Sequence, residues 1–243
     1  LMAVSQAALR FHFSEPGDGG LAAAERALSI DGNLAEAHAA IARVLTSNSK
    51  YDAAQHEIAT ALRLDSESFE VNTAAARLNY AQGRYEDATR YYEKAASLME
   101  SDFSSVAMLI ACYRSLGNQE GLRHAAQRTL ARAEKIAAQE PDNGMAMGYV
   151  VMSLIALGQG DRARELAKRA MLLDPDNLTM RYNFACGFVE LKDTETALNL
   201  LGAVREKDTL ETVNWAKVDP DLDALRDHPR FKAMIEGAET RLA

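Results

Sequence analysis

The chain has few of the residues that form disulfide frameworks, rigid turns or membrane spans. Its 243 residues include two cysteines, five prolines and one tryptophan. The two cysteines, Cys112 and Cys186, stand far apart in the pattern described below, so we expect reduced thiols and a cytoplasmic location. No apolar run approaches the roughly 20 residues that a membrane-spanning helix needs, which argues against the membrane as a partner.

Positive charge is scarce as well. The 35 aspartate and glutamate residues outnumber the 27 lysine and arginine residues, and the formal net charge is -8. An acidic surface repels phosphate backbones. The composition therefore disfavours nucleic acid as a partner.

Motifs that carry chemistry are also missing. The five histidines never form the i, i+4 pair of a metal-binding helix, and no serine lies in an elbow motif. Asp219, Asp221 and Asp223 imitate the start of a calcium loop, but Ala224 and Arg230 occupy the places where glycine and glutamate are required. We therefore predict no catalytic residues, no metal and no cofactor in this segment.

One amphipathic pattern, by contrast, recurs along the chain. In Gly83–Leu98, the residues Ala88, Tyr92 and Ala95 stand at i, i+4 and i+7 and so share one helix face. Buried alanines allow a neighbouring helix to come close. The alanine anchors of the copies lie 34 residues apart in two pairs, which are Ala54 with Ala88 and Ala163 with Ala197. The longer interval between Ala88 and Ala163 accommodates one further copy near Leu122.

The pattern resembles the tetratricopeptide repeat (TPR) family over roughly residues 2–205. The residues in phase with the family pattern are Ala42, Leu45, Ala54, Ile58, Ala61, Gly83, Tyr85, Ala88, Tyr92, Ala95, Gly158, Ala163, Asp174 and Pro175. The family's first-helix tryptophan is replaced in the successive repeats by His38, Asn72, Val106, Met147 and Arg181, and Leu122 stands where repeat four should have a small residue. The period and the resemblance together predict an all-α TPR-type α-solenoid of about six helix-turn-helix hairpins with a helical C-terminal cap.

The expected array covers residues 1–205. Its repeats are placed near 1–32, 33–66, 67–101, 102–141, 142–175 and 176–205. Residues 2–14 are interpreted as the first helix, and repeat four is expected to have a long second helix from Glu120 to Ala138, before Pro141. Because the chain begins at Leu1 without a start methionine, we interpret it as a segment of a longer protein.

Residues 206–243 fall outside the period and are interpreted as a C-terminal capping segment. An array needs such a cap because its last repeat leaves an apolar side uncovered, and we expect Trp215, Leu222, Leu225 and Phe231 to cover repeat six. The stretch Asp219–Phe231 also resembles the end of TPR regions in bacterial multidomain signalling proteins such as class III adenylate/guanylate cyclases. That resemblance implies a parent protein and assigns no activity to this segment.

In the TPR family the first helices of the hairpins line a concave groove. The resemblance places groove positions at fixed places in each repeat, and the candidate peptide-binding residues are Arg43, Thr73, Arg77, Tyr80, Arg114, Met152, Ile155 and Tyr182. Arginine binds carboxylates through a two-pronged contact and methionine adapts to apolar groups. The expected ligand is therefore a protein or peptide with an acidic part and a hydrophobic anchor. Alternatively, the arginines pair with glutamates such as Glu36, Glu70 or Glu120 and bind nothing. The Met-rich stretch that contains Met152 would then belong to the core or dock a segment of the parent protein.

We predict that this segment is a non-catalytic protein-protein interaction module. It would be the regulatory or scaffolding C-terminal part of a bacterial signalling protein with a cyclase-like parent. We further predict that it forms a homodimer or contacts another domain of that parent. The alternatives are a freestanding TPR adaptor and a chaperone-like protein that binds a peptide in its concave groove.

Overall fold

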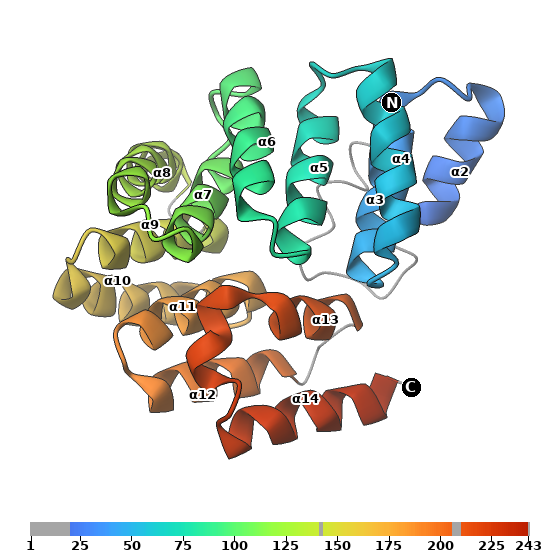
Figure 1. Ribbon diagram of the computed structural model, residues 1–243. Coiled ribbons are helices and arrows are strands. Elements are labelled where there is room, and N and C mark those ends of the chain that lie inside the picture. Colours follow the sequence, from blue (N-terminus) through green and yellow to red (C-terminus); the bar gives the residue numbers. More distant parts are fainter. Residues whose placement is uncertain (1–19, 141–142, 206–209, 243) are drawn as a thin grey trace. The chain divides into compact units, whose positions relative to one another are not determined.

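The computed structural model describes residues 20–140, 143–205 and 210–242, and all of its regular elements in these ranges are helical. The expected helix over residues 2–14, as well as Pro141, lies outside the described residues. The bounds of the helices are α2 Leu21–Ile30, α3 Ala35–Ser47, α4 Tyr51–Leu64, α5 Phe69–Ala81, α6 Tyr85–Leu98, α7 Ser104–Ser115, α8 Gln119–Gln139, α9 Gly144–Ala156, α10 Gly160–Leu173, α11 Leu178–Glu190, α12 Thr194–Arg205, α13 Leu210–Val218, the 3-10 helix η1 Pro220–Leu225 and α14 Pro229–Leu242. In Figure 1, α5 and α6 lie side by side and run in opposite directions, as the two helices of a hairpin do.

The turn inside each hairpin repeats the same backbone conformation. A residue with positive φ closes the first helix in five successive hairpins, and these residues are Ser49, Gly83, Gly117, Gly158 and Lys192. Their spacing is 34 residues except between Gly117 and Gly158, where it is 41. The left-handed region is open to glycine and strained for other residues. The period read from the sequence is thus visible in the backbone, and two hairpins keep it without glycine.

The position that lacks the family tryptophan has a different use here. In three repeats its side chain bonds a carbonyl oxygen six residues earlier, in the turn that precedes the helix. His38 contacts the carbonyl of Gly32 at 3.2 Å, Asn72 donates to Ser66 at 2.9 Å and Arg181 donates to Pro175 at 2.7 Å. A polar side chain at this place therefore satisfies the backbone of the turn, whereas a tryptophan would fill space between helices.

The chain is organised as two compact units. Unit 1 contains the described residues up to Glu100 together with α13, and unit 2 contains those from Ser101 to Arg205 and from Asp219 onward. The predicted boundary between an array and a cap near residue 205 remains a prediction.

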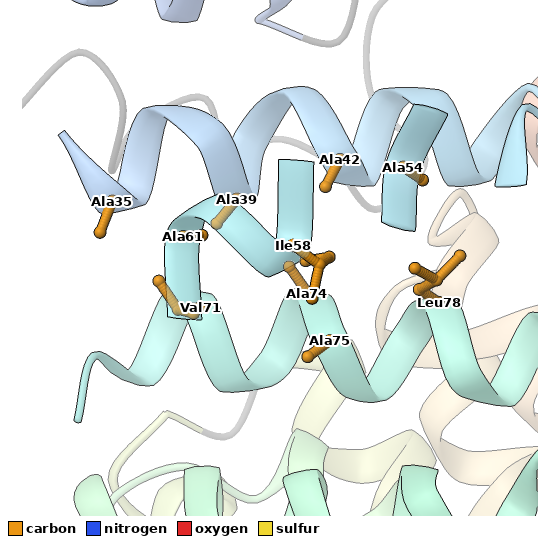
Figure 2. Close-up of a cluster of buried hydrophobic side chains, with 10 residues drawn as sticks. All are labelled: Ala35, Ala39, Ala42, Ala54, Ile58, Ala61, Val71, Ala74, Ala75 and Leu78. Atoms are coloured by element: carbon orange, nitrogen blue, oxygen red, sulfur yellow. The ribbon is translucent and has the colours of Figure 1, made fainter. Parts of the chain in front are cut away.

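Unit 1 has a core made largely of methyl groups. Ten buried residues of α3, α4 and α5 form one cluster, and seven of them are alanine. In Figure 2, Ile58 of α4 points into the space between α3 and α5, where it lies near Ala74. Because alanine side chains are short, three helices can approach one another closely around a few larger groups such as Ile58, Val71 and Leu78.

Unit 2 contains the longest described helix. α8 has 21 residues and agrees with the predicted long helix from Glu120 to Ala138 to within one residue at each end. It packs against both α7 and α9, with Leu122, Ala125, Ala126, Thr129 and Ala133 buried. Leu122 thus occupies the place of the family's small residue and is itself buried, at 7% exposure.

The last helix of unit 2 packs on repeat six. Phe231 and Ala238 of α14 are buried, and Arg230 binds Glu195 and Asn199 of α12 at 2.9 and 3.0 Å. The expectation for Trp215 was wrong, however, because its ring lies against residues of α5 in unit 1. Leu222 and Leu225 are buried in η1, which contacts α11 and α7. The tail is therefore three separate elements, because Asp219–Pro220 ends α13 before a new helix begins.

Candidate functional site

The predicted groove residues fall on first helices in both units. In unit 1, α3 holds Arg43 and α5 holds Thr73, Arg77 and Tyr80. In unit 2, α7 holds Arg114, α9 holds Met152 and Ile155, and α11 holds Tyr182. The helices α3 and α5 pack together, as do α7, α9 and α11.

In unit 1, residues of α5 and α13 form what we call the tryptophan site, consisting of Ser47, Arg77, Tyr80, Asn214 and Trp215. Arg77 and Tyr80 lie one turn apart on α5, so their side chains project from one face. The ring of Trp215 stacks on the ring of Tyr80, with centroids 5.2 Å apart and planes inclined by 19°. The guanidinium carbon of Arg77 lies 4.2 Å from the centroid of the Trp215 ring. The two predicted residues therefore meet on one indole.

The energies of these contacts are modest but specific. A stacked aromatic pair contributes about 0.5–1.5 kcal/mol beyond its buried area. A guanidinium over an indole adds about 0.5–2 kcal/mol, depending on how far water is excluded. Tyr80 is 1% exposed and also makes an edge contact with the ring of Tyr85, with centroids 5.6 Å apart. The surface that receives Trp215 is therefore rigid on the tyrosine side.

A polar contact fixes the register of α13 beside this stack. The amide nitrogen of Asn214 donates to the carbonyl oxygen of Ser47, at the end of α3, over 2.9 Å. A small pocket opens next to the indole, and its lining consists of Thr46, Ser47, Ser49, Tyr51, Arg77, Ala81, Asn214, Trp215 and Val218. The ring of Trp215 is only partly buried, whereas Thr212, Val213 and Ala216 of α13 are buried.

In unit 2, the contacts of α7 and α11 with η1 form what we call the aspartate site, consisting of Arg114, Tyr182, Glu190, Asp219 and Asp221. The guanidinium of Arg114 donates to Asp221 through one terminal nitrogen and to Glu190 through the other. The side chain of Asp221 is 7% exposed. Burial raises the pKa of Glu190, an effect that Arg114 opposes and the neighbouring Asp221 reinforces. One arginine therefore bridges two carboxylates, of which Asp221 is buried and Glu190 is more exposed.

Asp219 joins η1 to α11 from the other side. One carboxylate oxygen accepts a 2.7 Å hydrogen bond from the hydroxyl of Tyr182, and the other accepts the backbone N–H of Asp221 at 3.1 Å and so caps η1. Burial, and next the charge of Asp219, raise the pKa of Tyr182 well above its ordinary range. Both groups are nearly inaccessible to water, since Asp219 and Tyr182 are each 4% exposed.

The remaining predicted residues have more local contacts. The hydroxyl of Thr73 donates to the carbonyl of Phe69 within α5 at 2.9 Å. Ile155 is buried, and its terminal methyl lies where a side chain at Gly187 of α11 would begin, so it belongs to the contact between α9 and α11. Arg43 and Met152 are half-buried on α3 and α9.

Sequence reasoning missed the acceptors of these side chains. Asp219 and Asp221 were considered only as the start of a calcium loop, and Glu190 was not considered. The alternative that each arginine pairs with a nearby glutamate can be compared with the contacts of Arg114. This arginine pairs with Glu190 and Asp221 rather than with the neighbouring Glu120. In the structure, Arg77, Tyr80, Arg114 and Tyr182 all contact one segment of the same chain, residues 210–225. The lone tryptophan outside the period was the one available signal, because such a residue usually has a specific docking place.

One thiol lies beside the aspartate site. Cys186 lies 3.9 Å from Asp219, and burial followed by the charge of Asp219 raises the pKa of its thiol, which keeps the thiol protonated and poorly nucleophilic. Cys112 and Cys186 are both buried and form no disulfide. In the part of the chain that the structure describes, histidine, cysteine and carboxylate side chains nowhere gather in a group of three able to hold a metal ion. Across the same residues, no helix combines the length and the apolarity needed to cross a membrane.

Comparison with known proteins supports the fold. No protein-family model matches the chain, and no curated protein matches it by sequence. Among solved structures, the thermophilic TPR protein TTC0263 of Thermus thermophilus is similar with a TM-score of 0.56 and 18% identity, over 77% of this chain and 96% of that one. Pseudomonas aeruginosa PilF gives a TM-score of 0.51 at 12% identity, over 88% and 99%. Human IFIT1, solved as a dimer with m7Gppp-AAAA, gives 0.59 at 14% identity, over 98% of this chain and 60% of that one.

These likenesses concern the fold, since all three identities are low. Together with the helical hairpins and their period of 34 residues, they establish that the protein has an all-α fold of the TPR type. Folds of this class present extended surfaces for protein–protein interaction.

Proposed function

We propose that this chain is a non-catalytic interaction module that binds a protein segment along the first helices of its hairpins. The observation that carries the proposal is that these helices already hold a segment lying outside every hairpin, namely residues 210–225. Trp215 of that segment engages Arg77 and Tyr80, and Asp221 engages Arg114. The first-helix residues are therefore chemically competent to hold a peptide.

The ligand that fits this chemistry has an acidic part and an aromatic or apolar anchor. The internal segment has both, because Asp219 and Asp221 meet Tyr182 and Arg114, while Trp215 supplies the ring. We extend the proposal to the full predicted set, in which Arg43, Thr73, Met152 and Ile155 complete the first-helix surface. Of these, Ile155 contributes through packing between helices.

A peptide-display selection on the immobilised full chain tests the proposal. We expect enrichment of peptides that combine acidic residues with an aromatic or large apolar residue. Binding of these peptides should weaken in Arg114→Glu and persist in Arg123→Glu, since Arg123 is exposed on the second helix α8. A selection without enriched peptides, or enriched peptides indifferent to both changes, would contradict the proposal.

We further propose, from the likeness of Trp215 and Asp219–Phe231 to signalling proteins, that the segment belongs to a cytoplasmic bacterial signalling protein with a cyclase-like parent. A freestanding adaptor agrees equally well with the fold. An antibody against this segment distinguishes the two on an immunoblot of source-cell lysate. A band near 26.5 kDa indicates the adaptor, and a much larger band with nucleotide cyclase activity indicates the signalling parent.

A further inference from the structure

We infer that the tryptophan site of unit 1 is the binding site for a helical partner segment with a tryptophan anchor, and that α13 is its internal competitor. The inference deepens the proposed function and rests on it. It identifies which part of the first-helix surface receives the ligand, which anchor the ligand carries and what must leave before the ligand can bind.

The groups of unit 1 that contact Trp215 and Asn214 indicate which side chain a ligand needs at this site. The ring of Tyr80, stacked at 5.2 Å, offers a flat apolar face, and the guanidinium of Arg77, 4.2 Å from the indole centroid, attracts an electron-rich ring. Indole has the strongest attraction for a cation among the aromatic side chains. The carbonyl oxygen of Ser47 accepts a hydrogen bond from an amide donor one residue before the ring, Asn214, at 2.9 Å. A partner helix with a carboxamide residue followed by tryptophan therefore reproduces every named contact.

The internal occupant is short enough to be displaced. α13 has nine residues, and an isolated helix shorter than about 12 residues is marginal in water. Its helical form therefore depends on docking to unit 1. Trp215 itself is only partly buried. An external helix with the same anchor and a larger apolar face can hence compete with α13 for the site.

The first experiment measures binding in trans to the full chain. The probe is a fluorescein-labelled peptide with the sequence of residues 210–218, LETVNWAKV, followed by fluorescence anisotropy. Trp215→Ala removes the internal indole that contacts Tyr80 and Arg77. This variant should bind the probe about tenfold or more tightly than the wild type, because an internal competitor lowers the apparent affinity to the fraction of molecules whose site is open. Equal binding to both proteins would overturn the inference.

A matched pair of variants locates the probe. Added to Trp215→Ala, Arg77→Met should lower the affinity about tenfold, the factor that corresponds to a largely desolvated cation–π contact. Arg63→Met removes an exposed arginine from α4 of the same unit and should leave the affinity unchanged. A probe that responds equally to the two changes binds elsewhere, and the inference fails.

A second measurement needs no variant, because Trp215 is the only tryptophan of the chain. Its fluorescence, excited where tyrosine does not absorb, reports on the wild-type site directly. An unlabelled peptide in which phenylalanine replaces the tryptophan, LETVNFAKV, should shift the emission to the red as the Trp215 ring moves into water. Saturating peptide without any shift would mean that α13 is not displaced.

The remaining outcomes are distinguishable from failure of the proposed function. If display selection yields peptides that need Arg114 but not Arg77, the interaction module stands and the tryptophan site is not its receptor. Sedimentation of the wild type with Trp215→Ala tests a second copy as the occupant. A dimer that requires Trp215 on one chain would replace the foreign partner by this protein itself and would overturn the inference.

Discussion

The guanidinium of Arg114 in α7 binds the carboxylate of Asp221 in η1, although the two residues are 107 positions apart in the chain. Arg114 was predicted as a groove residue that would bind a carboxylate of a partner. In the structure it binds a carboxylate, but one supplied by its own chain, together with Glu190 of α11. The chemistry expected of this side chain is therefore present, and the ligand is internal.

The first prediction concerns the strength of this contact. Arg114→Ala leaves the buried carboxylate of Asp221 and the more exposed carboxylate of Glu190 without their shared cation, and we expect the free energy of unfolding of unit 2 to fall by about 1.5–3 kcal/mol. Chemical denaturation followed by circular dichroism measures the change. The control is Arg123→Ala on the exposed face of α8, which should stay within about 0.5 kcal/mol of the wild type. Equal effects of the two substitutions would show that the pairs to Asp221 and Glu190 contribute no stability.

The second prediction concerns the hydroxyl of Tyr182. Tyr182→Phe removes the 2.7 Å hydrogen bond to the buried carboxylate of Asp219, and the lost bond to a charged acceptor should lower the stability by about 1.5–3 kcal/mol near neutral pH. Tyr91→Phe, a half-buried tyrosine of α6, serves as the matched control and should have little effect.

The same residue predicts a dependence on alkaline pH. The pKa of Tyr182 is raised in the folded chain, so above its ordinary value of 10.0 the unfolded chain loses this proton while the folded chain keeps it. Stability contributed by the residue is thus complete below pH 10 and is lost as the pH rises further. Tyr182→Phe should have a flatter decline over that range in pH-dependent thermal melts. A parallel decline in both proteins would refute the assigned shift.

The third prediction uses the two hairpin turns that adopt positive φ without glycine. Lys192 has φ 59°, in the left-handed region that is strained for a residue with a Cβ atom. Lys192→Gly should therefore raise the free energy of unfolding by about 0.5–1 kcal/mol. The reverse change, Gly83→Ala, meets no neighbouring atom and should destabilise the chain by a similar amount through its φ of 71° alone. Thermal melts in which Lys192→Gly is less stable would contradict the argument.

The fourth prediction tests the alanine core. Ala54 of α4 is fully buried in the cluster shown in Figure 2, whereas Ala53 beside it is exposed. Ala54→Leu should reduce the stability by about 1–3 kcal/mol because the extra methyl groups force α3 and α5 apart. Ala53→Leu has the same change in composition and should have a small effect. Similar melting temperatures for the two variants would mean that the close approach of these helices is not needed.

The hairpins and the long helix α8 could be predicted from the sequence. The hairpin α5–α6 occupies Phe69–Ala81 and Tyr85–Leu98, which is the expected repeat three. The pattern that predicts it is local, because helix periodicity and a left-handed residue such as Gly83 act within a few positions of the chain. For the same reason the long helix α8 could be predicted from residues 120–138. The turns at Ser49 and Lys192 carry no such glycine signal, and the period alone places them.

The candidate site could be predicted only in part. Arg77, Tyr80, Arg114 and Tyr182 are engaged by the segment 210–225, while Ile155 proves to be buried between helices. The groove rule places these residues on first helices of the hairpins. It does not identify their acceptors, because ring stacking and ion pairing join residues whose separation along the chain has no regular value.

The sequence by itself determined the helices, their pairing into hairpins and the repeat of 34 residues, since these follow from contacts within one repeat or between successive ones. Only the tertiary structure decided where the non-repeating segment goes. Trp215 stacks on Tyr80, and Asp221 pairs with Arg114. Each contact joins a ring or a charge on a first helix to a residue far away in the sequence. The repeat pattern does not predict these contacts, because they depend on surfaces that form only after the hairpins have packed.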